Sequence, residues 1–186
     1  CTGQDRVQVP GAETQELFCV DDLSTATAQT NGRTDRSDWG TLHHRDTRNP
    51  TGIPGLQVDG YFPDTSTTNP WQGRNHDSQY VIRLPDDWNG KLVVTGAPGV
   101  RRQYANDFII SDWMLDRGYA FASTDKGNTG VQFYRDGHAM EEWNRRFTEL
   151  TIAARSAVSR RYGHAPRRTI ATGISNGGYL VRWQLE

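Results

Sequence analysis

The chain has 186 residues and a formal net charge of −1 at pH 7, and apolar residues make up 34% of its composition. This length can bury one sizeable core, and the near-neutral charge argues against a nucleic-acid-binding protein, which would carry a clustered basic face. No run approaches the roughly 18 consecutive apolar residues that a membrane-spanning helix requires, so we expect no membrane partner.

Residues 1–77 are rich in Thr, Asp, Asn, Gly and Arg, and turn-forming stretches recur every few positions. Short extended pieces are expected at 17–20 and 56–62, with no helical period of any length. Such a segment cannot bury much apolar surface alone. We therefore expect a polar N-terminal arm over 1–77 that wraps a core formed by residues 78–186.

The arm contains the two cysteines of the chain, Cys1 and Cys19. An even count in a polar segment suits a disulfide that fastens the arm, and the alternative is a pair of free thiols. A disulfide would imply a secreted protein. Neither cysteine has a histidine near it at ligand spacing, so we expect no metal site and no other cofactor.

From residue 78 onward the chain alternates between predicted strands and predicted helices. Strands are expected at 78–85, 91–96, 119–124 and 168–174, and helices at 106–117, 139–162 and 176–186. Long helices between strands require crossover connections, which produce a mainly parallel sheet with helices on both faces. The expected fold class is α/β.

The last predicted strand runs into Gly173-Ile174-Ser175-Asn176-Gly177, a G-x-S-x-G sequence at the start of a helix. Glycines two residues to either side let the strand and helix approach closely, and the serine hydroxyl then projects from the turn. The N–H of Asn176 and the positive end of the helix would face a developing oxyanion. This arrangement predicts a nucleophilic Ser175, the alternative being an ordinary serine in a glycine-rich turn.

A second glycine-rich turn, Gly96-Ala97-Pro98-Gly99, follows the strand expected at 91–96. In this architecture the loop after that strand supplies the other oxyanion donor. Pro98 has no N–H, so Ala97 or Gly99 must donate, and we predict Ala97. Gly96 and Gly99 are expected to line the substrate site, unless this is only a structural turn.

Asp125 follows the strand expected at 119–124. It would lie at the carboxyl end of the strand, where sites gather in open α/β sheets. Either Asp125 lines the substrate site or orders its loop, or it forms an ordinary turn.

Three stretches together resemble a known family: YVIRLPDDWNGKLVVTGAPGV, DWMLDRGYAFASTDKGNTG and GISNGGYLVRWQLE. They look like the α/β-hydrolase esterases grouped around tannases, feruloyl esterases and 3-hydroxybutyrate-oligomer hydrolases, over roughly residues 78–186. The resemblance implies a secreted serine ester hydrolase with Ser175 as nucleophile and the Asn176 N–H in the oxyanion hole. Tannases and feruloyl esterases usually carry a cysteine immediately before the serine, where this chain has Ile174. That departure favours short hydroxyalkanoate oligomers or related polyester fragments as substrates, with gallates or ferulates as the alternative.

A serine triad also needs a histidine and a carboxylate, which follow the serine in the chain order of α/β-hydrolases. Only residues 176–186 follow Ser175, with Glu186 as their one carboxylate. All histidines lie upstream: His43, His44, His76, His138 and His164. We therefore expect the acid and the histidine to come from a continuation of the chain or from a second chain. The 186 residues alone are then expected to show little or no turnover.

Other interpretations remain open from the sequence. The pair His43-His44 could reach the site from the arm, and His138 with Glu141 could form a metal pair, although exposed surface positions explain both. A non-catalytic binding module with a degenerate hydrolase core would account for the missing base. A peptidase on the same fold is not distinguished from an esterase by any residue.

Overall fold

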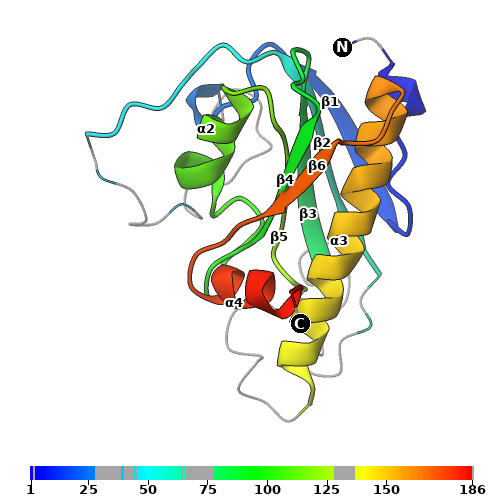
Figure 1. Ribbon diagram of the computed structural model, residues 1–186, viewed down its shortest axis with the longest axis vertical. Helices are drawn as coiled ribbons and strands as arrows, with labels where there is room; N and C mark the ends of the chain where they lie inside the picture. Colours follow the sequence, from blue (N-terminus) through cyan, green and yellow to red (C-terminus); the bar gives the residue numbers. More distant parts are fainter. Residues whose placement is uncertain are drawn as a thin grey trace.

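The computed structural model of the protein describes residues 1, 3–27, 39, 44, 46–63, 65, 78–127 and 137–185. Its elements, labelled in Figure 1 where there is room, are η1 (Gln4–Arg6), β1 (Thr14–Val20), η2 (Thr25–Thr27), β2 (Gly55–Phe62), β3 (Ser78–Pro85), β4 (Lys91–Gly96), η4 (Asp107–Ser111), α2 (Asp112–Leu115), β5 (Ala120–Thr124), α3 (Ala139–Tyr162), β6 (Arg168–Ala171) and α4 (Asn176–Trp183). The strands predicted at 78–85 and 91–96 and the helix predicted at 139–162 have these bounds. The helix predicted at 106–117 is the π-helix η4 followed by the short α2.

The strands of the described residues form one six-stranded sheet in the order β1-β2-β3-β5-β4-β6. Strand β4 runs parallel to both of its neighbours, β5 and β6. The remaining pairs, β1 with β2, β2 with β3 and β3 with β5, are antiparallel. The α/β class is therefore confirmed, but the sheet is mixed rather than mainly parallel. Residues 1–77 contribute β1 and β2 to the sheet, and β3 at the start of the expected core also pairs antiparallel with β5.

Helices cover both faces of the sheet, as Figure 1 shows: α3 lies along one face and α2 lies on the other. Alternation along the strands divides their side chains between the two layers. In β4, Leu92 and Val94 join the cluster under α3, whereas Val93 joins the cluster under α2. Phe121 of β5 likewise packs on the α2 side. Strands buried on both faces explain the continuous apolar runs of the sequence.

Helix α3 is held to the sheet by apolar side chains that recur at three- and four-residue steps. Trp143, Phe147, Leu150 and Val158 are fully buried in this cluster. The helix ends at Gly163, which adopts a left-handed conformation (φ 81°) and donates its N–H to the Ser159 carbonyl. This left-handed cap is the conformation that glycine adopts without a Cβ clash.

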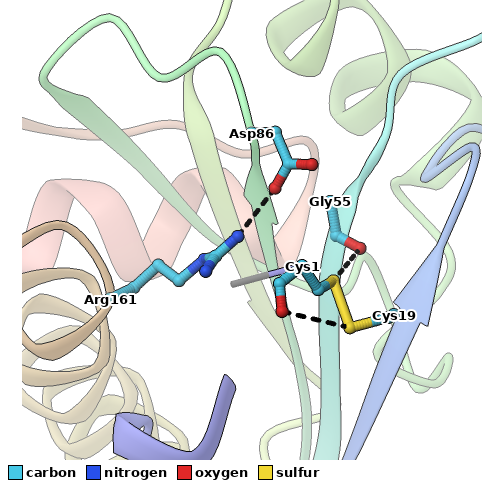
Figure 2. Close-up of a disulfide and its surroundings, with 5 residues drawn as sticks. All are labelled: Cys1, Cys19, Gly55, Asp86 and Arg161. Atoms are coloured by element: carbon cyan, nitrogen blue, oxygen red, sulfur yellow. Dashed lines mark hydrogen bonds and ion pairs between the residues drawn. A yellow bond between two sulfur atoms is a disulfide. The ribbon is translucent and has the colours of Figure 1, made fainter. Parts of the chain in front are cut away.

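The predicted disulfide is present and joins Cys1 to Cys19, near the end of β1. Figure 2 shows the bridge beside the start of β2, where the Sγ of Cys1 lies 3.0 Å from the Gly55 carbonyl oxygen. In the same view Arg161 of α3 reaches across to Asp86, immediately after β3, at 2.7 Å. The bridge and the ion pair tie the N-terminal residues and α3 to the same end of the sheet.

A buried polar cluster lies between the sheet and η4. Arg83 of β3, 1% exposed, makes a bidentate ion pair with Asp107, with distances of 2.6 and 2.8 Å. Its Nε donates to Gln57, and its Nη1 also donates to the Ser111 hydroxyl. Burial opposes the guanidinium charge, but the Asp107 carboxylate outweighs burial, and the net pKa of Arg83 is raised. The pair therefore fastens β3 to η4 as a charged, hydrogen-bonded unit.

Two further buried carboxyl groups flank this pair, and they should make the stability of the fold depend on pH. Burial raises the pKa of Asp59 to about 6, and burial also raises the pKa of Asp112 to about 6, from the ordinary 3.8. The unfolded chain ionises these groups near pH 4, whereas the folded chain must do so near pH 6. Folding stability is thus expected to fall as the pH rises from about 4 to 6, by about 3 kcal/mol per group.

Urea unfolding of the wild-type chain and of the Asp59→Asn variant between pH 4 and 7.5 measures this effect. The difference in unfolding free energy between the two proteins should change across pH 4–6 and then level off. A difference that stays constant over that range would contradict the assignment for Asp59.

None of the helices described in the structure has the length and apolar character needed to cross a membrane.

Candidate active site

Ser175 lies at the sharp turn between β6 and α4 and is exposed. Its backbone has φ 55° and ψ −121°, a region that residues with a Cβ rarely adopt and that costs about 1–3 kcal/mol. The Gly177 N–H donates to the Ile174 carbonyl at 2.9 Å, and the Tyr179 N–H donates to the Ser175 carbonyl at 3.1 Å. The turn thus passes directly into the first turn of α4 and holds Ser175 at its tip.

The glycines of the G-x-S-x-G sequence are required by close backbone contacts. A Cβ added to Gly173 would lie 2.3 Å from the Gly177 carbonyl carbon. A Cβ added to Gly177 would lie 2.5 Å from the carbonyl oxygen of Gly96, the last residue of β4. The start of α4 therefore packs on the end of β4 at backbone distance. This contact brings Ser175 next to the loop that follows β4.

The loop after β4 is connected to both neighbouring segments. The Asn176 side chain donates to the Gly99 carbonyl oxygen at 3.4 Å, which links the serine turn to the loop. The Ala97 N–H donates to the Thr124 carbonyl oxygen at 2.9 Å, and Ala97 is fully buried. The amide predicted as the second oxyanion donor is therefore already engaged at the sheet edge. Of the two donors that the sequence left open, Gly99 remains as the candidate.

Asp125 orders the turn that follows β5. Its buried carboxylate accepts hydrogen bonds from the Gln79 N–H at 2.9 Å and from the Gly127 N–H at 2.7 Å. These bonds tie the end of β5 to the beginning of β3. The geometry favours the loop-ordering role over direct contact with a substrate.

The contacts of the described histidines are with residues outside the serine turn and the loop after β4. His44 is 3.6 Å from Asp46, and His138 is 3.8 Å from Glu141, with all four side chains strongly exposed. His164 is exposed and its ring lies 5.0 Å from Trp88, near the start of β4 rather than its end. The remaining candidates for a base or an acid, His43, His76 and Glu186, lie outside the described residues. The part of the chain that the structure describes shows no group of three potential metal ligands.

Two polar residues near the carboxyl ends of β4 and β5 had no predicted role in the site. Asn106, fully buried before η4, donates to the Thr95 hydroxyl and to the Gly96 carbonyl, both at 3.1 Å. Lys126, 1% exposed, donates from Nζ to the Ala97 carbonyl oxygen at 2.5 Å. A lysine directly after Asp125, at the carboxyl end of a predicted strand, was the available signal for the second of these.

The serine turn brings together an exposed hydroxyl on a strained backbone, the amide end of a helix and a glycine-rich loop. Backbone N–H groups at a helix start stabilise negative charge that develops on an oxygen atom nearby. The chemistry that such an arrangement supports is nucleophilic attack by Ser175 once a base is brought to it.

Comparison with known proteins agrees with this geometry. The family model described as tannase and feruloyl esterase matches residues 64–181. Among similar solved structures, feruloyl esterase B from Aspergillus oryzae is 17% identical with a TM-score of 0.63, and the match covers 95% of this chain and 34% of that chain. An esterase from Aspergillus oryzae is 16% identical with a TM-score of 0.61, covering 94% and 32%.

Tannin acyl hydrolase from Aspergillus niger is also similar, at 15% identity and a TM-score of 0.53, covering 95% of this chain and 32% of that chain. At these identities the likeness establishes the fold, which is that of the α/β-hydrolases. The chain spans about a third of the length of these structural relatives. A search of curated proteins returns no significant match.

Proposed function

Because the chain belongs to the tannase and feruloyl esterase family, we propose that it carries the nucleophile and oxyanion half of a carboxylic ester hydrolase. The observation that supports this most strongly is the backbone of Ser175, held at φ 55° between β6 and a helix that packs on Gly96. A serine of purely structural function would gain nothing from this strained conformation.

The reaction would proceed through an acyl-enzyme. The Oγ of Ser175 attacks the ester carbonyl carbon while its proton passes to a histidine base, and the N–H groups of Asn176 and Gly99 hold the oxyanion. The bond to the alcohol oxygen then breaks as the histidine returns the proton to that oxygen. Water attacks the acyl-serine in the second half and releases the carboxylic acid and the free serine.

We propose that the histidine and its acid lie outside these 186 residues, in a continuation or in a second chain. Strand β6 pairs with β4 on one side and with no described strand on the other. Near this edge, Ile170 and Ile174 are 40% and 41% exposed. An additional strand along β6 would cover them and complete the sheet, in keeping with the much greater length of the structural relatives. On this proposal the isolated chain shows little or no turnover.

For the substrate we propose esters of aromatic acids, the chemistry named by the matching family and by two of the similar structures. Hydroxyalkanoate oligomers are the second candidate for the substrate. They are supported by Ile174, which stands where tannases and feruloyl esterases usually carry a cysteine. The Cys1–Cys19 disulfide supports a location outside the cytoplasm, where such bridges persist.

Hydrolysis assays on the native protein, with any further segment or chain attached, test the proposal. Methyl gallate, methyl ferulate and a 3-hydroxybutyrate dimer are compared in wild type and in Ser175→Ala, with Ser159→Ala, on the surface of α3, as control. Hydrolysis that Ser175→Ala abolishes and Ser159→Ala preserves supports an esterase, and the preferred substrate decides between the two classes. A native protein that cleaves none of these esters would favour a non-catalytic binding module.

A further inference from the structure

Lys126 lies directly after β5, and its ammonium group is buried beneath the loop that follows β4. Its Nζ donates to the Ala97 carbonyl oxygen at 2.5 Å and lies 5.1 Å from the centre of the Trp143 ring in α3. Its aliphatic stem passes Gly96, where an added Cβ would lie 3.8 Å from the lysine Cδ. A buried ammonium group is costly unless it is hydrogen-bonded. The hydrogen bond to the Ala97 carbonyl ties this ammonium group to the loop beside Ser175.

The backbone of Lys126 is unusual in the same way as that of the proposed nucleophile. Among the described residues other than glycine, Lys126 (φ 71°) and Ser175 (φ 55°) are the ones with positive φ. One follows β5 and the other leads from β6 into α4, and the strand between these two is β4. Strained backbone of this kind persists only where the surroundings enforce it, and it concentrates at functional sites.

Lys126 and Thr124 hold Ala97 at both of its backbone polar groups. The Thr124 carbonyl accepts the Ala97 N–H at 2.9 Å, and the Thr124 hydroxyl accepts the Lys126 N–H at 3.0 Å. The Lys126 ammonium group in turn donates to the Ala97 carbonyl, which completes the set of hydrogen bonds around Ala97. Both peptide planes of Ala97 are thereby fixed relative to the end of β5.

The fixed Ala97 carbonyl determines the direction of the next peptide. Pro98 has a restricted φ, and its carbonyl accepts the Arg101 N–H at 3.2 Å. A trans peptide is planar, so the Gly99 N–H points away from the Pro98 carbonyl. The direction of the Gly99 amide is therefore set by Lys126 at one end of this short segment and by Arg101 at the other.

We propose that Lys126 is a positioning residue for the ester-cleaving site: it holds the loop after β4 so that the Gly99 N–H faces the oxyanion formed at Ser175. This inference rests on the proposed esterase function. Loss of the ammonium group should slow the covalent step and leave the initial binding of a reagent unchanged. The expected size is about tenfold to a hundredfold, the range for a misdirected donor or a displacement of roughly 1 Å.

The test measures how fast a fluorophosphonate modifies Ser175 in the native protein, with the binding constant and the maximal rate determined separately. Lys126→Met removes the donor and the charge, whereas Lys126→Arg keeps both. Lys91→Met is the matched control, because Lys91 is the only other lysine and its Nζ likewise lies over an aromatic ring, that of Tyr119 at 5.2 Å. Thermal unfolding of each variant shows whether it is folded.

The proposal expects a maximal rate reduced at least tenfold in Lys126→Met, with an unchanged binding constant, partial recovery in Lys126→Arg and a wild-type rate in Lys91→Met. Folded Lys126→Met that reacts at the wild-type rate overturns it. Equal losses in Lys126→Met and Lys91→Met also overturn it, as does failure of both Lys126 variants to fold, since Lys126 would then serve the fold rather than the loop. A wild-type protein that does not react at all refutes the esterase proposal instead.

Discussion

Replacing Gly177 by alanine should lower the esterase rate of the native protein by about a hundredfold and should also destabilise the fold. The new Cβ would lie 2.5 Å from the Gly96 carbonyl oxygen, a backbone atom that cannot move without shifting β4. Overpacking of this kind costs about 1–3 kcal/mol, and a displacement of roughly 1 Å at a reacting group costs about a hundredfold in rate. Alanine at other helical positions normally stabilises a protein relative to glycine. A loss of stability in Gly177→Ala would therefore identify the contact with Gly96 as the cause.

The neighbouring glycine provides the matched control. A Cβ on Gly178 would lie 3.4 Å from the Gly173 carbonyl oxygen, an ordinary contact distance. Gly178→Ala should therefore retain the wild-type rate and gain up to about 1 kcal/mol from helix propensity. Ester hydrolysis and urea unfolding of the two variants are compared side by side. Equal behaviour of Gly177→Ala and Gly178→Ala would show that α4 does not pack on β4 as described.

Replacing Arg83 by methionine should destabilise the fold by about 3–5 kcal/mol, because the carboxylate of Asp107 would be left buried without its partner. For a chain of this size that loss corresponds to a decrease of about 6–20 °C in melting temperature. It is also a large fraction of the stability of a typical domain. Differential scanning calorimetry at pH 7 measures it directly.

Two further variants test whether the loss of stability comes from the Arg83–Asp107 ion pair itself. Arg83→Met combined with Asp107→Leu removes both charges and should recover most of the lost stability, since apolar replacements of buried ion pairs are often tolerated. Arg117→Met, on an exposed arginine whose side chain donates to the Trp113 carbonyl, should change stability by less than about 0.5 kcal/mol. A double variant as unstable as Arg83→Met alone would contradict the account of this pair.

The sequence predicted the elements whose signals are local. Alternation of polar and apolar residues predicted β3, and a continuous apolar run predicted β4. The spacing of Trp143, Phe147 and Leu150, with Gly163 after the end, predicted α3. The pair of cysteines predicted the disulfide, which is present. These features depend on neighbouring residues, so composition and periodicity were sufficient to find them.

The features that escaped prediction depend on contacts between distant segments. Arg83 reads as a polar position of an alternating strand, and only the packing of η4 shows that it pairs with a buried Asp107. Strand β1 is longer than the piece expected at 17–20 because its register with β2 extends to Thr14. At the site, the Ala97 amide looked available until β5 placed the Thr124 carbonyl against it.

The central claim is that Ser175 is a nucleophile, and fluorophosphonate labelling of the native protein with peptide mapping by mass spectrometry tests it most directly. In this reaction the serine Oγ forms a bond to phosphorus, fluoride leaves and the base accepts the serine proton. We predict one label per chain, located on Ser175, absent in Ser175→Ala and retained in Ser159→Ala. Native protein that hydrolyses esters but carries no label on Ser175, or carries it on another residue, would contradict the account.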